Sequence, residues 1–171
     1  MKRIALAIAA AALTVGSVHA VTLAPGTMET RVSGQFDSTT INGSLTELNI
    51  SYGYFFLDNL QAGGRIGLFE NDNVTLNTVS AFTEYNFEIG SEDWLPYVEG
   101  ALGLADGDGE GGVTEFAVTL QAQAGIKYFL APNVAISTAV VIDFASDEIY
   151  PDEDRYDNND ARLQLAIRYY Y

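Results

Sequence analysis

Seven charged residues are the part of this sequence that could do chemistry. They stand among small and polar residues, at Arg65, Glu84, Glu99, Lys127, Asp143, Arg162 and Arg168. A carboxylate pair such as Glu84 and Glu99 can supply a general acid and a general base. Basic residues in the same pattern also explain these carboxylates as structural ion pairs. We therefore interpret the seven as a charge network and expect no catalytic, cofactor-binding or metal-binding residue among them.

Other reactive groups are scarce. The chain has no cysteine, and His19 is its only histidine. Without cysteine, the chain forms no disulfide and has no thiolate chemistry. If the leader is removed, no histidine is left for histidine-dependent hydrolysis. The run Asp106–Gly111 superficially resembles a calcium loop, but Ala117 stands where the EF-hand pattern needs glutamate. We predict a solvated loop there, no cofactor, and a protein that is not an enzyme.

The first 20 residues have the pattern of a secretory signal peptide. Lys2 and Arg3 precede the apolar stretch Ile4–Val15, and Val18-His19-Ala20 forms a small-x-small cleavage site. The apolar stretch is shorter than the roughly 20 residues of a membrane-spanning helix. A buried N-terminal helix is the alternative. We predict a cleaved signal over residues 1–20 and a single domain over residues 21–171.

The charge of the chain is strongly one-sided. It has 23 acidic and 8 basic residues and a formal net charge of −15. Clustered lysine and arginine are needed to bind phosphate backbones, so nucleic acid is disfavoured as a partner. Six basic residues lie beyond the predicted signal: Arg31, Arg65, Lys127, Arg155, Arg162 and Arg168.

The charged residues are positioned by segments in which apolar and polar residues alternate. A period of two is the pattern of a two-faced β-strand. Eight such segments are expected: Met28–Phe36, Glu47–Phe56, Leu60–Leu68, Val74–Phe87, Val98–Ala105, Phe116–Tyr128, Val134–Phe144 and Ala161–Tyr171. No segment has a convincing helical period. The sequence therefore predicts an all-β protein.

The predicted connections are of two kinds. Leu57–Asn59 and Leu130–Asn133 are tight turns inside a repeated pattern, Y-F-F-L-D-N and Y-F-L-A-P-N, in which Asp, Asn and Pro favour turning. The others are polar and are expected to be solvated loops: Asp37–Ser44, Glu70–Asn73, Asp106–Gly112 and Ala145–Asp160. Short turns at one end and longer loops at the other are typical of membrane barrels.

Alternation alone does not say which face is inside. In a soluble lipocalin-like barrel the apolar face would enclose an apolar ligand. Here the polar face carries mostly Gly, Ala, Ser, Thr and Gln, which suit a cramped lumen better than a solvated surface. Aromatic residues also gather at strand ends, as in an interfacial girdle: Tyr54–Phe56, Tyr85, Phe87, Trp94, Tyr97, Tyr128, Phe129 and Tyr169–Tyr171.

The closing segment A-R-L-Q-L-A-I-R-Y-Y-Y and the Y-F-L-x-x-N turns resemble the small outer-membrane β-barrel family typified by OmpA and OmpX. The resemblance implies an eight-stranded antiparallel up-and-down transmembrane barrel, exported to the cell outer membrane. It implies a side-chain-filled lumen and a structural or surface-interaction role. A narrow gated pore and a secreted soluble barrel are the alternatives. The implied partners are outer-membrane lipid, lipopolysaccharide and, during assembly, the barrel-insertion machinery, for a monomeric protein.

In that family the terminal aromatic strand is also the signal read during insertion, which here falls on Ile167, Tyr169 and Tyr171. Deleting Tyr171 should lower the yield of barrel in the membrane fraction of cells. Protein refolded in detergent should melt close to the wild type, because only one rim side chain is lost. Membrane yield and the melting temperature check this prediction. Normal yield in cells would remove the assembly role.

Overall fold

The computed structural model describes residues 23–40, 43–70, 74–91, 93–109, 116–151 and 156–171. Within them the chain forms a closed antiparallel barrel of eight strands, ordered β1-β10-β7-β6-β5-β4-β3-β2. Each strand pairs with its neighbour in the sequence, and β1 closes on β10. The described residues contain no helix long and apolar enough to cross a membrane. The predicted up-and-down barrel is confirmed.

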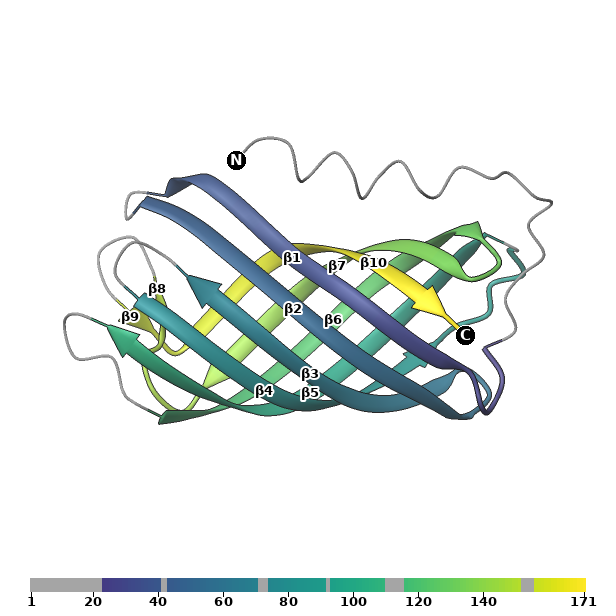
Figure 1. The fold of residues 1–171 in the computed structure, drawn as a ribbon, viewed down its shortest axis with the longest axis horizontal. Helices are drawn as coiled ribbons and strands as arrows, with labels where there is room; N and C mark the ends of the chain where they lie inside the picture. Colours follow the sequence, from purple (N-terminus) through teal and green to yellow (C-terminus); the bar gives the residue numbers. More distant parts are fainter. Residues whose placement is uncertain (1–22, 41–42, 71–73, 92, 110–115, 152–155) are drawn as a thin grey trace.

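The barrel strands are β1 (Met28–Thr40), β2 (Gly43–Leu57), β3 (Leu60–Glu70), β4 (Val74–Asn86), β5 (Trp94–Gly109), β6 (Phe116–Ala131), β7 (Val134–Ala145) and β10 (Asn159–Tyr170). A two-stranded ribbon, β8 (Tyr150–Pro151) and β9 (Tyr156–Asp157), stands between β7 and β10. Figure 1 shows the strands tilted along the barrel, with β8 and β9 at one end. The tight turns and the C-terminus lie at the other end, which we call the turn end; the first is the loop end.

The turn end owes its shape to local residue types. Asn59 has a positive φ of 62°, a conformation that asparagine tolerates better than most residues. The N-terminal segment runs beneath this turn, where the Asn59 amide donates to the carbonyl of Leu23 at 2.9 Å. The seam between the ends of the sheet is closed by Met28 and Tyr171, which exchange backbone hydrogen bonds of 2.9 and 3.0 Å.

Along the barrel strands most large aliphatic residues face outward, and most of the buried inward side chains are polar or charged. Ile66, Leu102, Leu163 and Leu165 are each more than 60% exposed, whereas inward Gln61, Glu84, Lys127 and Arg168 are 0% exposed. Burial is therefore inverted relative to a soluble barrel. This exterior suits hydrocarbon, because a closed barrel satisfies all its backbone groups internally.

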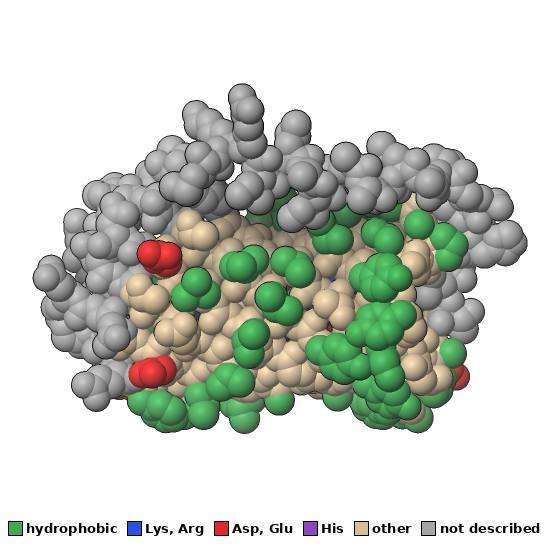
Figure 2. Space-filling view, in the orientation of Figure 1, with side chains coloured by type: hydrophobic (Ala, Val, Ile, Leu, Met, Phe, Trp, Pro, Cys, Tyr) green, Lys and Arg blue, Asp and Glu red, His purple; other side chains and the backbone are tan. Residues whose placement is uncertain are grey.

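The outward aromatic residues form a girdle at the turn end. Tyr54, Tyr85, Trp94 and Tyr169 lie outside and are 44–48% exposed. Figure 2 shows large hydrophobic side chains gathered at that end of the barrel. On β5 the outward apolar positions begin at Trp94 and end at Leu104, close to the roughly 9–11 residues of a membrane-spanning strand.

Four of the aromatic residues expected in this girdle lie inside the barrel instead. They are Phe55, Tyr97, Phe129 and Tyr170, all no more than 4% exposed. Each immediately follows or precedes an outward neighbour, and a period of two forces such neighbours onto opposite faces. Because these aromatic residues lie close together in the sequence, all of them had been assigned to the outward girdle.

The expected loops Asp37–Ser44 and Asp106–Gly112 are shorter than predicted, because β1, β2 and β5 continue into them. The β1–β2 ladder extends to the pair Thr40–Gly43, and the β4–β5 ladder extends to the pair Val74–Gly109. Strands already in register keep exchanging backbone hydrogen bonds beyond the apolar band, where outward side chains no longer need to be apolar. Polar, glycine-rich sequence there was misread as loop.

Two neighbouring glycines leave room for an aromatic ring inside the barrel. Gly53, Gly63 and Phe82 stand side by side on β2, β3 and β4. A Cβ at Gly63 would lie 2.7 Å from the Phe82 ring and 2.0 Å from the backbone oxygen of Tyr52. The ring thus fills the space above two glycines, an arrangement known to stabilise glycines within sheets.

Adjacent glycines give a matched test of this packing. Gly63→Ala should lower the free energy of unfolding by about 1–3 kcal/mol, because overpacking forces backbone to move. Gly64→Ala should have little effect, since a Cβ there meets only the Ser80 carbonyl at 3.9 Å. Urea titration of both variants in lipid measures the difference. Equal loss in the two variants would contradict the inward placement of Gly63.

Candidate functional site in the barrel lumen

The structure places all seven charged residues on the inward face of the barrel. Six are buried, with exposures of 5% or less, and the Arg162 side chain is 13% exposed. They fall into two groups. The inner group, nearer the turn end, contains Arg65, Glu84, Glu99, Lys127 and Arg168; the outer group, nearer the loop end, contains Asp143 and Arg162.

Glu84 is the centre of the inner group. Its carboxylate accepts from Lys127 Nζ at 2.6 Å, Arg168 Nη1 at 2.7 Å and Gln61 Nε2 at 2.7 Å. Asn86 Nδ2 donates to it at 3.2 Å. A fully buried carboxylate is tolerable when it is paired and hydrogen-bonded in this way.

Glu99 joins a second pair of cations to the same group. Arg31 Nη1 donates to it at 2.7 Å, and Arg65 Nη2 donates to its other oxygen. Arg31 also approaches Glu84 at 3.4 Å, so the two carboxylates share one guanidinium. Glu84 and Glu99 are therefore held as counter-ions, and the structure gives neither an unpaired position for proton transfer.

Sequence reasoning missed two members of the inner group. Glu29, 1% exposed, accepts from Arg168 Nη1 at 2.9 Å and from Lys127 Nζ at 3.3 Å. Arg31 had been recognised only as one of the six basic residues beyond the predicted signal, without a partner. The alternate positions Glu29, Arg31 and Ser33 could have indicated a polar inward face. The alternation in β1 is too irregular, however, for that face to be fixed from the sequence.

Four cations thus face three carboxylates in the inner group, and aromatic rings accompany the surplus charge. The Arg168 guanidinium lies 4.4 Å from the centre of the Tyr97 ring. Arg31 and Arg65 lie 5.0 and 5.5 Å from the centre of the Phe82 ring. Cations over ring faces are attracted by the ring quadrupole. The inward aromatics therefore belong to the charge network.

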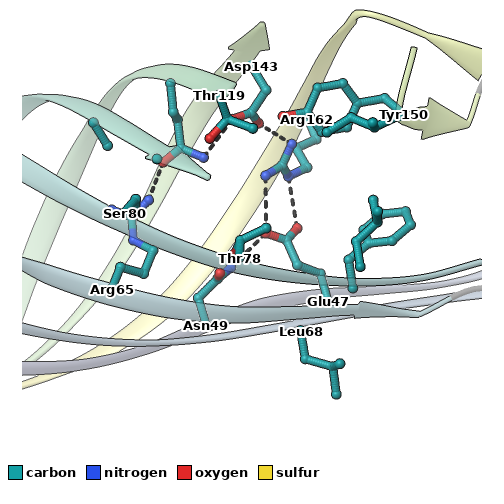
Figure 3. A pocket seen from close by; sticks show the side chains of 16 residues that line it. Glu47, Asn49, Arg65, Leu68, Thr78, Ser80, Thr119, Asp143, Tyr150 and Arg162 are labelled. Carbon is teal, nitrogen blue, oxygen red and sulfur yellow. Dashed lines mark hydrogen bonds and ion pairs between the residues drawn. The ribbon is translucent and has the colours of Figure 1, made fainter. Parts of the chain in front are cut away.

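The outer group is built around Arg162. Its Nε lies 2.8 Å from Glu47 Oε2, and its Nη1 lies 2.7 Å from Asp160 Oδ2 and close to Asp143. Figure 3 shows the guanidinium between Glu47 and Asp143, with Tyr150 beside it. Glu47 is a further residue that sequence reasoning missed, because its partner lies 115 positions away in the sequence.

Gln121 connects the two groups. Its side-chain oxygen accepts from Arg65 Nη1, and its Nε2 donates to Asp143 Oδ1 at 2.8 Å. Polar contacts therefore run without a break from Glu29 near the turn end to Asp160 near the loop end. A neutral amide between the groups can donate to one and accept from the other.

An apolar cluster closes the lumen at the turn end. It consists of the buried residues Leu23, Phe55, Phe129, Ala135 and Tyr170, with Leu95 packed against it. The rings of Phe129 and Tyr170 lie 5.5 Å apart. We call this cluster the floor. It separates the inner charge group from the turn-end mouth.

The loop end is partly covered by the segment between β7 and β10, which had been expected to be solvated throughout. Ile149 is 1% exposed and packs with Leu76, Ala105 and Ala117 inside the mouth. Tyr150 packs against the same cluster. Burial, reinforced by the nearby Asp143 carboxylate, raises the pKa of the Tyr150 phenol. An acidic composition concealed these two inward residues, which we call the roof.

The three residues of the predicted assembly signal lie on the outside of β10 and at its end. Ile167 and Tyr169 are 48% exposed, and Tyr171 is 55% exposed. Thr30 and Tyr171 lie within hydrogen-bonding distance, 3.2 Å, across the closing seam. No group of His, Cys, Asp and Glu that could hold a metal ion is found in the described residues. The run Asp106–Gly111 extends beyond them.

Comparison with known proteins rests on structure. No family model matches the sequence, and no curated protein sequence matches it. The N-terminal β-barrel domain of Pseudomonas aeruginosa OprF aligns with a TM-score of 0.63 at 15% identity, over 86% of this chain and 98% of that domain.

Two further solved structures show the same architecture. Neisserial surface protein A aligns with a TM-score of 0.60 at 18% identity, over 84% of this chain and 95% of that one. The outer-membrane enzyme PagL aligns with a TM-score of 0.54 at 14% identity, over 84% of this chain and 99% of that one. By its closed sheet, apolar exterior and filled interior, this chain has the fold of the small eight-stranded outer-membrane β-barrels.

Proposed function

We propose that this protein is an integral outer-membrane barrel with a closed lumen, acting as a structural or surface-interaction component of the cell envelope. The filled lumen is the observation that carries this proposal. From the turn end outward it contains the floor, the inner charge group, Gln121, the outer group and the roof. Eight strands enclose an interior that side chains just fill, so no continuous aqueous path is required by the fold.

The loop end is the surface available to partners. Its exposed carboxylates include Glu70, Asp106 and Glu148, and no exposed basic side chain accompanies them in the described residues. Contact with lipopolysaccharide phosphates would then need bridging divalent cations, and a macromolecular partner would need a basic surface. We also propose that residues 1–20 are removed, that the insertion machinery assembles the barrel, and that the barrel is monomeric.

Two alternatives are weaker. A secreted barrel holding an apolar ligand would need an apolar interior, whereas here the interior is charged. A narrow pore would require the ion pairs to part and the floor to open. One structural neighbour, PagL, is an enzyme, but the carboxylates Glu84 and Glu99 are fully engaged as counter-ions. A non-enzymatic role therefore agrees best with the site.

Removing one carboxylate tests whether the network holds the barrel together. Glu84→Gln leaves Lys127 and Arg168 to share Glu29 alone, and breaking a buried pair costs about 3–5 kcal/mol, less where water enters the lumen. Glu70→Gln removes an equal charge from the exposed rim and should leave stability almost unchanged. The urea midpoint in lipid measures both. Equal midpoints would show that the lumen charges contribute nothing.

Conductance in planar bilayers tests whether the lumen is closed. The wild-type barrel should show no steady current. Glu99→Ala should produce current steps, because Arg31 and Arg65 lose their common partner and repel each other. Arg65→Ala should leak less, since Glu99 keeps Arg31. Steady wild-type current of similar size to the Glu99→Ala current would favour the pore alternative.

Protease added to intact cells tests the proposed topology. The Ala145–Asp160 segment should be cut, because it is the longest connection at the loop end and carries exposed Glu148 and Asn158. The Asp58–Asn59 turn should be spared, because it would face the periplasm. Cutting at Asp58 with an intact long loop would mean that the barrel is inverted.

A further inference from the structure

The seam between β1 and β10 closes the barrel over only part of its length. Its ladder starts at the turn end and stops at the pair Gly34–Leu165. Beyond that pair β1 is paired with β2 alone, and β10 is paired with β7 alone. Figure 1 shows the two strands meeting near the C-terminus and diverging toward the loop end. We call the two facing edges, residues 35–40 of β1 and 159–164 of β10, the open seam.

The open seam lies at the depth of the apolar band. Along residues 159–164, β10 is paired with the part of β7 that carries outward Val140, Ile142 and Phe144, which are 42–52% exposed. Leu163 on β10 is itself 69% exposed. Hydrocarbon offers no hydrogen bonds, so a backbone edge without a strand partner is costly at this depth. Pairing of the two edges would remove that cost.

The two edges are matched in length and register. Continued beyond Gly34–Leu165, the same ladder would set Gln35 opposite Gln164. It would finish with Thr40 opposite Asn159, where β1 ends and β10 begins. Neither strand would be left with an unpaired residue. The strands are therefore built for a longer seam than the one they form here.

Gln164 shows what such a seam would supply. Its side chain is 4% exposed, and its Nε2 has no hydrogen-bond partner. A buried amide donor is costly to leave unmet. In the continued register its neighbour across the seam is Gln35, whose side-chain oxygen can accept from it. The first step of the longer seam therefore satisfies a group that the present arrangement leaves unmet.

Gly34, the last paired residue of β1, lets the two strands separate. A Cβ at Gly34 would overlap the carbonyl oxygen of Glu47 on β2. A regular strand has room for a Cβ at each position, so the overlap marks a bend in β1 at the point where it leaves β10. Glycine inside a strand commonly occupies a bend of this kind. Gly34 is therefore the residue about which the outer part of β1 turns.

We propose that the open seam is a lateral gate in the barrel wall. In the open state β1 bends at Gly34 and the two edges stand apart, as they do in this structure. In the closed state the ladder continues to the ends of both strands. Arg162 on β10 and its partner Glu47 on β2 stand behind the gate. The gate therefore connects the outer group with the part of the bilayer nearer the loop end, although the lumen is closed along its axis.

Paired cysteines test the gate, because the chain has no cysteine of its own. Ser33–Ala166 in the formed ladder and Gln35–Gln164 in the closed gate both fall on its non-hydrogen-bonded positions. At such positions the two Cα atoms lie about 4.5 Å apart, which permits a disulfide. The double variant Gln35→Cys/Gln164→Cys therefore reports the closed gate, and Ser33→Cys/Ala166→Cys is its matched control.

Both double variants are refolded in lipid vesicles and oxidised with copper phenanthroline, and free thiols are counted with a maleimide. The control pair should cross-link rapidly. The gate pair should cross-link completely but about 10–1,000 times more slowly, because a minor closed state populated at about 0.1–10% must form first. Equal rates would mean that the seam is always closed, and no cross-link at the gate pair would mean a fixed gap. Either result would overturn the proposal.

The hinge predicts the direction of a further change. Gly34→Ala should speed cross-linking of the gate pair and leave the control pair unchanged, because a Cβ fits a straight strand but not the bend. Gly100→Ala is the matched control, since a Cβ at Gly100 meets nothing within 4 Å, and it should change neither rate. Slower or unchanged cross-linking of the gate pair in Gly34→Ala would contradict the gate.

Amide exchange in the unmodified barrel gives a test that needs no variant. Along β10 the backbone groups alternate in direction, so the Ala161 and Leu163 amides face the open seam and the Arg162 and Gln164 amides face β7. NMR in lipid nanodiscs should show Ala161 and Leu163 exchanging about tenfold faster than Arg162 and Gln164, the effect of one missing hydrogen bond. Equal protection of the four amides would show a closed seam and overturn the proposal.

Discussion

Closure of eight strands into one sheet is the constraint on which the rest of this structure depends. A closed sheet has no free edge, so its outside can face hydrocarbon, and its inside is too narrow for much more than side chains. Every inward residue must then find its partner across the lumen. Glu84 shows the consequence, because it gathers Lys127, Arg168 and Gln61 from three other strands around one buried carboxylate.

The lumen is organised in layers along the barrel, and the layers differ in what they exclude. The floor at the turn end is apolar, so it keeps ions out by dehydration. The inner charge group is nearly balanced and is supported by the faces of Phe82 and Tyr97. The outer group places Arg162 between Glu47 and Asp143 and lies beside a cavity of about 60 Å³.

The β7–β10 connection links the surface to this interior. Its acidic composition suits water, yet Ile149 and Tyr150 turn inward and join Leu76, Ala105 and Ala117. Solvent-facing charge and an apolar anchor therefore occur in one segment. Ile149 and Tyr150 therefore belong both to the loop and to the lining of the outer cavity.

The sequence by itself determined the eight strands and the inward side of the seven charged residues, because a period of two is a local property that each strand carries alone. It did not fix the faces of β1, where the alternation is irregular. Tertiary structure alone decided the partners. Arg31, Glu29 and Glu47 meet residues more than 60 positions away, and only barrel closure and register bring them together. It also decided which neighbouring aromatics line the floor, and that Ile149 leaves an acidic loop for the lumen, because only a barrel mouth offers it apolar neighbours to pack against.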